Sequence, residues 1–118
     1  VFLGMVTGKA KASADISMDQ FGLTPYFRDF EYGWVHGPRK PEAIRAILAR
    51  QGLSAAETAY VGDAPSDIVA AREAGVTMYS AAWASTVDEA AREELRGLGP
   101  DEIFYSVADF REFLRGRV

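Results

Sequence analysis

Two carboxylates follow one predicted strand in residues 62–67, whose sequence is GDAPSD. An apolar run ends there and Pro65 suits the first turn of a helix, so Asp63 and Asp67 flank a strand-to-helix turn. Hard cations such as Mg²⁺ take one or two carboxylates together with waters and substrate phosphate, which this spacing could supply. Both carboxylates could equally cap the helix and complement its dipole. The pattern leaves a metal site and a helix cap open.

A second candidate site is Thr7-Gly8-Lys9, which follows the apolar run of residues 1–6. A hydroxyl, a glycine N–H and the N-terminus of the next helix would converge there on an anion such as phosphate. Thr7 could instead be only the N-cap of that helix. The segment is not a Walker A loop, because neither Ser nor Thr follows the lysine.

A third candidate is Lys40, which precedes Pro41 and is predicted at the N-cap of the next helix. A cation is unfavourable at this position, because it lies beside the positive end of the helix dipole. An unfavourable residue at such a position points to a functional role, and an ammonium group is suited to binding phosphate. The alternative is a solvated lysine beside Arg39. His36 and Trp34 could also approach a ligand, although packing roles suit them as well.

Short apolar runs alternate with stretches of helical period, which is typical of βα units that build a parallel sheet. Strands are predicted at residues 1–6, 30–35, 58–61, 76–80 and 103–105, and helices at 9–21 and 41–51, at 65–74, from 86 onward, and after Ser106. Ligands bind beyond the carboxyl ends of such strands, which is where Thr7 and Asp63 lie. We therefore expect a Rossmann-like three-layer αβα fold in one domain, residues 1–118, without an internal boundary.

Composition excludes several classes of function. The chain has 13 basic and 17 acidic side chains, a formal charge of −4, and so lacks the basic surface that nucleic acids or anionic membranes attract. It contains no cysteine, which excludes disulfides, thiolate metal sites and thiol nucleophiles. No apolar run is long enough for a membrane span or a signal peptide. We expect a cytoplasmic protein with a small-molecule ligand and no nucleic-acid or membrane partner.

Taken in order, the candidate motifs resemble the haloacid dehalogenase superfamily, and most closely its phosphoglycolate-phosphatase-like branch. The resemblance runs over nearly the whole chain and rests on residues 7–8 (TG), 40–42 (KPE), 60–68 (YVGDAPSDI) and 70–75 (AAREAG). It implies Mg²⁺-dependent hydrolysis of a small phosphorylated metabolite through an aspartyl-phosphate.

The resemblance also implies roles for five residues. Thr7 and the amide of Gly8 would bind phosphoryl oxygens, and Lys40 would neutralise the phosphate and orient the nucleophile. Asp63 would bind Mg²⁺, and Asp67 would hold the water shell of the metal.

One motif of the family is missing from the sequence. The nucleophile and its acid–base partner form an Asp-x-Asp pair upstream of the threonine motif, and no aspartate here has another two residues on. We expect an incomplete core without its first strand and cap, inactive alone, whose start at Val1 cuts into a strand. The missing strand would lie between the strands that end at Thr7 and Asp63. An upstream segment, another chain through self-association, or direct pairing of these two strands could fill the gap.

Two other functions remain open at this point. The chain could be a non-catalytic Rossmann-like module that binds phosphate or serves regulation. It could also belong to a haloacid dehalogenase in the chemical sense, although a Mg²⁺-binding Asp63 favours a phosphatase, because displacement of a halide needs no metal to neutralise phosphate.

Overall fold

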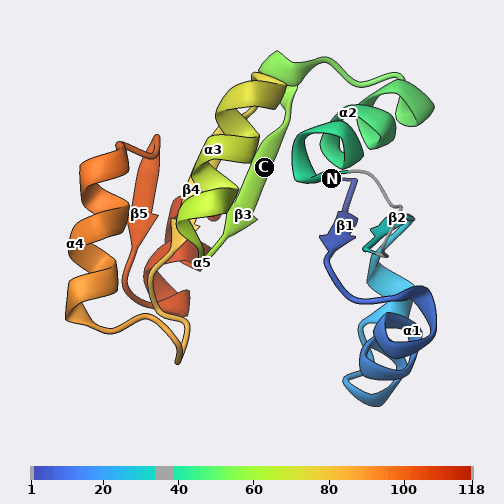
Figure 1. The fold of residues 1–118 in the computed structure, drawn as a ribbon, viewed down its shortest axis with the longest axis horizontal. Coiled ribbons are helices and arrows are strands. Elements are labelled where there is room, and N and C mark those ends of the chain that lie inside the picture. Colours follow the sequence, from blue (N-terminus) through green and yellow to red (C-terminus); the bar gives the residue numbers. More distant parts are fainter. Residues whose placement is uncertain (1, 34–38, 118) are drawn as a thin grey trace. The chain divides into compact units, whose positions relative to one another are not determined.

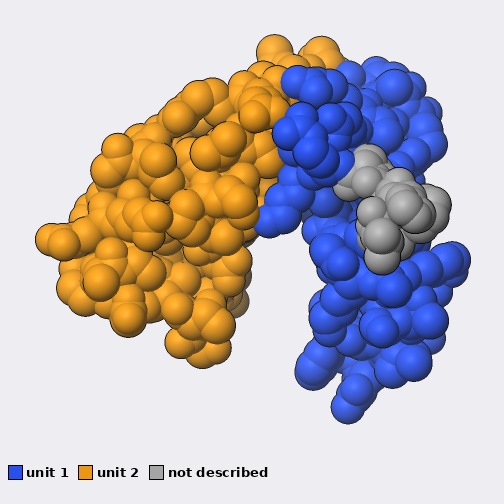
Figure 2. All heavy atoms as spheres, viewed as in Figure 1, with its two compact units in different colours: residues 1–53 blue, residues 54–118 orange. Residues whose placement is uncertain are grey.

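The computed structural model describes residues 2–33 and 39–117, in which parallel strands alternate with helices (Figure 1). The chain gathers into two compact units, residues 1–53 and 54–118 (Figure 2). The predicted α/β class with parallel strands is confirmed in both. A single domain without a boundary stays a prediction. His36 and Trp34 lie outside the described residues.

The first unit is a two-stranded parallel sheet with a helix packed on it. Strand β1 (Gly4–Thr7) pairs with β2 (Asp29–Tyr32), and α1 (Lys11–Gln20) with the short 3₁₀ helix η1 (Thr24–Tyr26) connects them. Helix α2 (Lys40–Gln51) contacts both strands. The apolar side chains that α2 buries are Ala43, Ile44, Ile47 and Leu48. They repeat at helical spacing, which explains why this helix covers the sheet.

The ends of α2 show one correction to the expectation from the sequence. Lys40, predicted as the N-cap, is the first helical residue, and Arg39 is the N-cap. The reason is Glu42, whose carboxylate accepts the Arg39 backbone N–H at 2.8 Å and so fixes the start of the helix one residue earlier. At the other end Gly52 has a φ of 64°, which ends the helix as predicted.

An ion-pair cluster ties the last turn of α2 to the start of β2. The Arg50 guanidinium donates to Asp29 at 2.8 and 3.1 Å and also pairs with Glu31, while the Gln51 amide donates to Asp29 at 2.9 Å. These hydrogen bonds, chiefly those from Arg50, hold the pKa of Asp29 below its usual value. The contact therefore stabilises the ionised carboxylate.

Replacement of Arg50 by methionine is expected to lower the free energy of unfolding by about 1 kcal/mol at pH 7. The effect is small because the guanidinium is half-exposed and water screens its charge. The pKa of Asp29 is lower in the folded chain than in the unfolded chain. The contact with Arg50 therefore stabilises the fold above the unfolded-state pKa, and this contribution is lost as the pH falls through the folded-state pKa. Urea unfolding at pH 7 and pH 3 measures both values. The control is Arg28→Met, at an exposed arginine one residue before Asp29. An equal loss at the two pH values would contradict the assignment.

The second unit is a three-stranded parallel sheet in the order β3-β4-β5, formed by β3 (Ala59–Gly62), β4 (Thr77–Ala81) and β5 (Glu102–Phe104). Its helices are η2 (Ala55–Glu57), α3 (Pro65–Ala74), α4 (Glu89–Leu98) and α5 (Val107–Arg115). The ring of Tyr79 on β4 packs against Phe110 and Phe113 of α5, while Met78, on the opposite face, lies beside Ile68 of α3. This unit therefore has the predicted three layers, with α5 and α3 on opposite faces of the sheet.

Most helix ends in this unit follow their local signals, with one exception. Gly75 ends α3 with a φ of 76°, and the Ser106 hydroxyl accepts the Asp109 amide at 3.1 Å to begin α5, both as predicted. Thr86 does not begin α4 as predicted. The helix begins at Glu89 because the Asp88 carboxylate accepts the Ala91 amide at 2.9 Å and supplies the cap.

Both strands beside the predicted gap lie at the edge of a sheet. Within residues 2–33 and 39–117, β1 is hydrogen-bonded only to β2, and β3 only to β4. The three ways to complete the core, an upstream segment, another chain or direct pairing of these strands, stay predictions. Leu3, directly before β1, and Val61 on β3 are each 43% exposed. In the same residues, no helix has the length and apolar character needed to cross a membrane.

Candidate functional site

The turn after β3 carries Asp63, and Asp67 lies in the first turn of α3. The Asp67 backbone N–H donates to the Ala64 carbonyl and the Ala64 N–H donates to Asp67 Oδ2, both at 3.0 Å. Asp67 is thus the cap of its own helix, which confirms the capping alternative for this residue. Its carboxylate points inward and is only 5% exposed, whereas Asp63 is exposed.

Two residues of β3 enclose the Asp67 carboxylate. The Tyr60 O–H donates to Asp67 Oδ1 at 3.2 Å. Gly62 leaves the space that the carboxylate occupies, since a Cβ on this residue would lie 2.4 Å from Asp67 Oδ2. Burial, together with the nearby charge of Asp67, raises the pKa of Tyr60 above its usual value. Tyr60 could not be singled out from the sequence, because its position in a strand gives no sign of a polar partner.

Thr86 reaches the exposed carboxylate from the loop after β4. Its hydroxyl donates to Asp63 Oδ2 at 3.4 Å. The sequence pattern predicts Thr86 only as a helix start and gives no direct sign of this contact. The usable signal is topological, because loops at the carboxyl ends of adjacent parallel strands meet at one edge of the sheet.

The oxygen donors at this edge suit a hard cation. Asp63 offers an exposed carboxylate beside the Thr86 hydroxyl, and Mg²⁺ binds through one or two carboxylates while water and phosphate complete its shell. In the part of the chain that the structure describes, no three His, Cys, Asp or Glu side chains gather into a metal cluster. The residues fit a cation that takes few protein ligands, with Asp63 as the direct one.

Thr7 is the last residue of β1, and Gly8 begins the turn that follows it. Thr7 Oγ1 accepts the Lys9 backbone N–H at 3.2 Å, which leaves the hydroxyl proton able to donate. Helix α1 begins at Lys11 with Ala10 as its N-cap, so the alternative that Thr7 merely caps this helix is wrong.

Gly33 completes this turn and was missed in the sequence. Its backbone N–H donates to the Lys9 carbonyl at 3.0 Å, and a Cβ at Gly33 would lie 2.2 Å from the Gly8 carbonyl oxygen. Only glycine permits two backbone segments to approach so closely. Gly33 lies inside the predicted strand 30–35, and a glycine within a strand often marks a close approach of another backbone segment, which is the signal that could have identified it.

Lys40 occupies the first position of α2, at the opposite end of the helix from the Arg50 cluster. Its side chain is partly exposed. The ammonium group lies in the first turn, where the helix dipole disfavours positive charge. A bound anion would be attracted both by the ammonium group and by the N-terminal end of the dipole. This placement keeps the phosphate-binding interpretation of Lys40.

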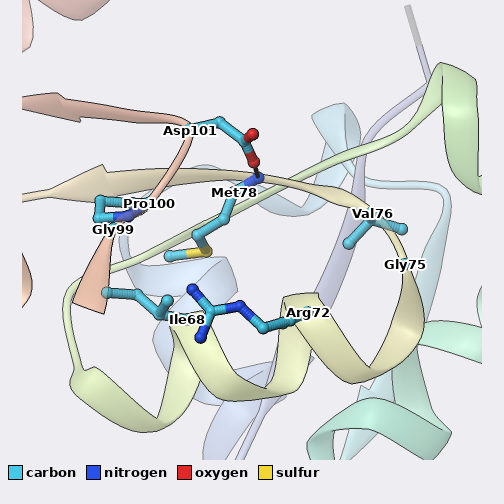
Figure 3. Close-up of a pocket in the computed structure, with 8 residues that line it drawn as sticks. All are labelled: Ile68, Arg72, Gly75, Val76, Met78, Gly99, Pro100 and Asp101. Atoms are coloured by element: carbon cyan, nitrogen blue, oxygen red, sulfur yellow. Dashed lines mark hydrogen bonds between the residues drawn. The ribbon is translucent and has the colours of Figure 1, made fainter.

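A hollow of about 280 Å³ lies at the other end of the second unit, where β4 begins and α3 and α4 end (Figure 3). Arg72 crosses it and donates to the Leu98 carbonyl at 2.6 Å, while Asp101 accepts the Met78 backbone N–H at 2.8 Å. Both charged groups thus serve backbone atoms at the ends of helix and strand. This hollow lies where β4 begins, whereas Asp63 follows the end of β3, and none of the predicted site residues lines it.

The chain is similar to one family of hydrolases and to several proteins that are named phosphatases. Residues 1–81 match the family model described as haloacid dehalogenase-like hydrolase. The chain is 29% identical over 114 residues to a phosphoglycolate phosphatase of Rhodospirillum rubrum, which covers 95% of this chain and 45% of that protein. It is 34% identical over 82 residues to a phosphoglycolate phosphatase of Xanthomonas campestris pv. campestris, covering 68% and 37%. The chain thus spans less than half the length of these relatives.

Solved structures agree in fold. A haloacid dehalogenase-like family hydrolase from Streptococcus pneumoniae aligns with a TM-score of 0.83 at 20% identity, covering 96% of this chain and 52% of its own. A hydrolase of the same superfamily from Geobacter sulfurreducens aligns with a TM-score of 0.62 at 30% identity, covering 69% and 42%.

Proposed function

Because the chain belongs to the haloacid dehalogenase-like hydrolases, we propose that it carries the phosphate-binding and cation-binding residues of a Mg²⁺-dependent phosphatase for a small phosphorylated metabolite. The observation that carries this proposal is the turn after β3, which buries Asp67 as a cap and leaves Asp63 exposed beside Thr86. The names of several relatives make phosphoglycolate the first substrate to test. A cytoplasmic location and self-association stay predictions.

The phosphate-binding and the cation-binding residues have distinct tasks in this proposal. The Thr7 hydroxyl and the Gly8 N–H bind phosphoryl oxygens, and the Lys40 ammonium offsets their charge. Asp63 would hold Mg²⁺, which when bound neutralises phosphate oxygens. Asp67 fixes the turn that presents Asp63; that it also orders the water shell of the metal stays a prediction.

The nucleophile must come from outside these 118 residues, because the sequence contains no Asp-x-Asp pair. The edge strands β1 and β3 support this, since each is hydrogen-bonded to a strand on one side only among the described residues. We therefore expect the chain by itself to be inactive.

The test compares the chain alone with a fusion that adds the amino-terminal half of the Rhodospirillum rubrum relative. Only the fusion should hydrolyse p-nitrophenyl phosphate and phosphoglycolate, and only with Mg²⁺. Asp63→Asn should lower its rate by at least about a hundredfold, because the cation loses its direct ligand. Circular dichroism of each variant controls for folding.

Three other results would decide against the proposal. Hydrolysis by the chain alone that Asp63→Asn abolishes would show that the nucleophile is not missing. A folded but inactive fusion would favour a non-catalytic phosphate-binding or regulatory module. Metal-independent halide release from a haloacid would favour dehalogenation.

A further inference from the structure

The hydroxyl of Tyr60 makes a contact that none of the proposed roles uses. Tyr60 and Gly62 occupy alternate positions of β3 and therefore face the same side of the sheet, where α3 places Asp67. Because Gly62 has no side chain, the Asp67 carboxylate fits against the strand and meets the Tyr60 O–H at 3.2 Å.

Both oxygens of the Asp67 carboxylate are held by donors. Oδ2 accepts the Ala64 N–H at 3.0 Å, and Oδ1 accepts the Tyr60 hydroxyl. Asp67 is 5% exposed, so water cannot easily replace a donor that is lost. The phenol and the amide both help to hold this carboxylate in its orientation.

That orientation controls where Asp63 lies. Ala64 is the residue directly after Asp63, and its N–H is the group that Asp67 holds. If the carboxylate rotates, the amide loses its acceptor and the turn loosens on the side of Asp63. A phenol is protonated at neutral pH, and burial raises the pKa of Tyr60 further, so its hydroxyl is a hydrogen-bond donor.

We propose that Tyr60 is a positioning residue, whose hydroxyl acts through Asp67 and the Ala64 amide to hold Asp63 in place for a divalent cation. This inference rests on the proposed function only in taking Asp63 as the cation ligand. Groups that orient a metal ligand without touching the metal commonly change affinity by tenfold or more when removed.

The experiment measures Mn²⁺ binding to the 118-residue chain by electron paramagnetic resonance of the free ion, with Mg²⁺ as competitor. Tyr60→Phe removes one oxygen and should weaken Mn²⁺ binding about tenfold. It should also speed hydrogen exchange of the Ala64 amide. The double variant Tyr60→Phe with Asp67→Asn should bind no more weakly than Asp67→Asn alone, because the hydroxyl acts through that carboxylate.

Two control variants separate positioning from a general loss of stability. Tyr79→Phe removes a hydroxyl from a tyrosine on the neighbouring strand whose ring packs against α5. Ser80→Ala removes a fully buried hydroxyl opposite Gly62 that has no hydrogen-bond partner in the described part of the chain. Neither should change Mn²⁺ affinity or Ala64 exchange, measured well below the melting temperature of every variant.

The outcomes for Tyr60 and for the proposed function can be told apart. If the wild-type chain binds Mn²⁺ and Tyr60→Phe binds it equally well, the role of Tyr60 is wrong while the cation site stands. If the wild type binds no Mn²⁺, the cation site at Asp63 is wrong, and hydrogen exchange of the Ala64 amide alone tests Tyr60. Faster exchange in Tyr60→Phe would support the role of the hydroxyl in fixing the turn, and unchanged exchange would refute that role.

Discussion

Replacing Gly62 with alanine is expected to lower the free energy of unfolding by about 2–3 kcal/mol and to abolish cation binding at Asp63. The new Cβ would lie 2.4 Å from Oδ2, 2.5 Å from Cγ and 2.7 Å from Cβ of Asp67. Forcing extra atoms into a packed site typically costs about 1–3 kcal/mol. The effect belongs at the upper end because Asp67 is buried and its carboxylate is held by two hydrogen bonds.

The cost cannot be avoided by a small rotation of the aspartate. Its carboxylate is buried and bonded to the Ala64 amide and the Tyr60 hydroxyl, so any shift breaks hydrogen bonds that no water replaces. The Cβ of Asp67 is itself too close, which means that α3 would have to move away from β3. The variant therefore damages both the packing of α3 and the turn that carries Asp63.

Gly97→Ala is the matched control for this substitution. Gly97 lies inside α4, has open space within 4 Å of the point where a Cβ would lie, and does not have a positive φ. Alanine there should raise stability by about 0.5–1 kcal/mol, because glycine is a poor residue for the interior of a helix. Urea unfolding of both variants measures the two effects. A Gly62→Ala chain as stable as wild type would show that the close approach is not real.

Substitution of Lys40 by methionine should lower kcat of the fusion by about 10²–10³-fold. A fixed charge at the phosphoryl group stabilises the transition state more than the substrate, and removal of one such group typically has this effect. Methionine keeps the length and apolar stem of lysine, so α2 should remain on its strands. The measurement is the steady-state rate with Mg²⁺ and p-nitrophenyl phosphate.

The control for Lys40 is Lys11→Met. Lys11 is an exposed lysine that pairs with Asp15 at 2.7 Å, four residues on, and such surface pairs contribute little. This variant should retain the wild-type rate. Lys40→Arg should recover only part of the activity, because a guanidinium is bulky and planar where a point charge is needed. A Lys40→Met rate within about twofold of wild type would remove Lys40 from the mechanism.

Local signals in the sequence were enough to place most helices and strands. Gly52 and Gly75 end α2 and α3 with positive φ, and Ser106 begins α5, because these residues act on their immediate neighbours. The ordered motifs were enough to identify the family, which the comparisons confirm. Errors arose where two caps competed nearby, as at Thr86, where Asp88 two residues later supplies the cap.

The tertiary structure alone decided how the site residues are held. The bonds of Tyr60 to Asp67 and of Thr86 to Asp63 join side chains whose residue types carry no mark of their partner. A hydrogen bond forms only when the donor and acceptor lie within about half an ångström of the ideal distance and at a suitable angle. The pairing of the strands and the packing of α3 set both quantities. The sequence determined by itself which groups could do chemistry and at which strand ends. Only the packed fold turned Asp67 inward as a cap and left Asp63 exposed at the edge of the sheet.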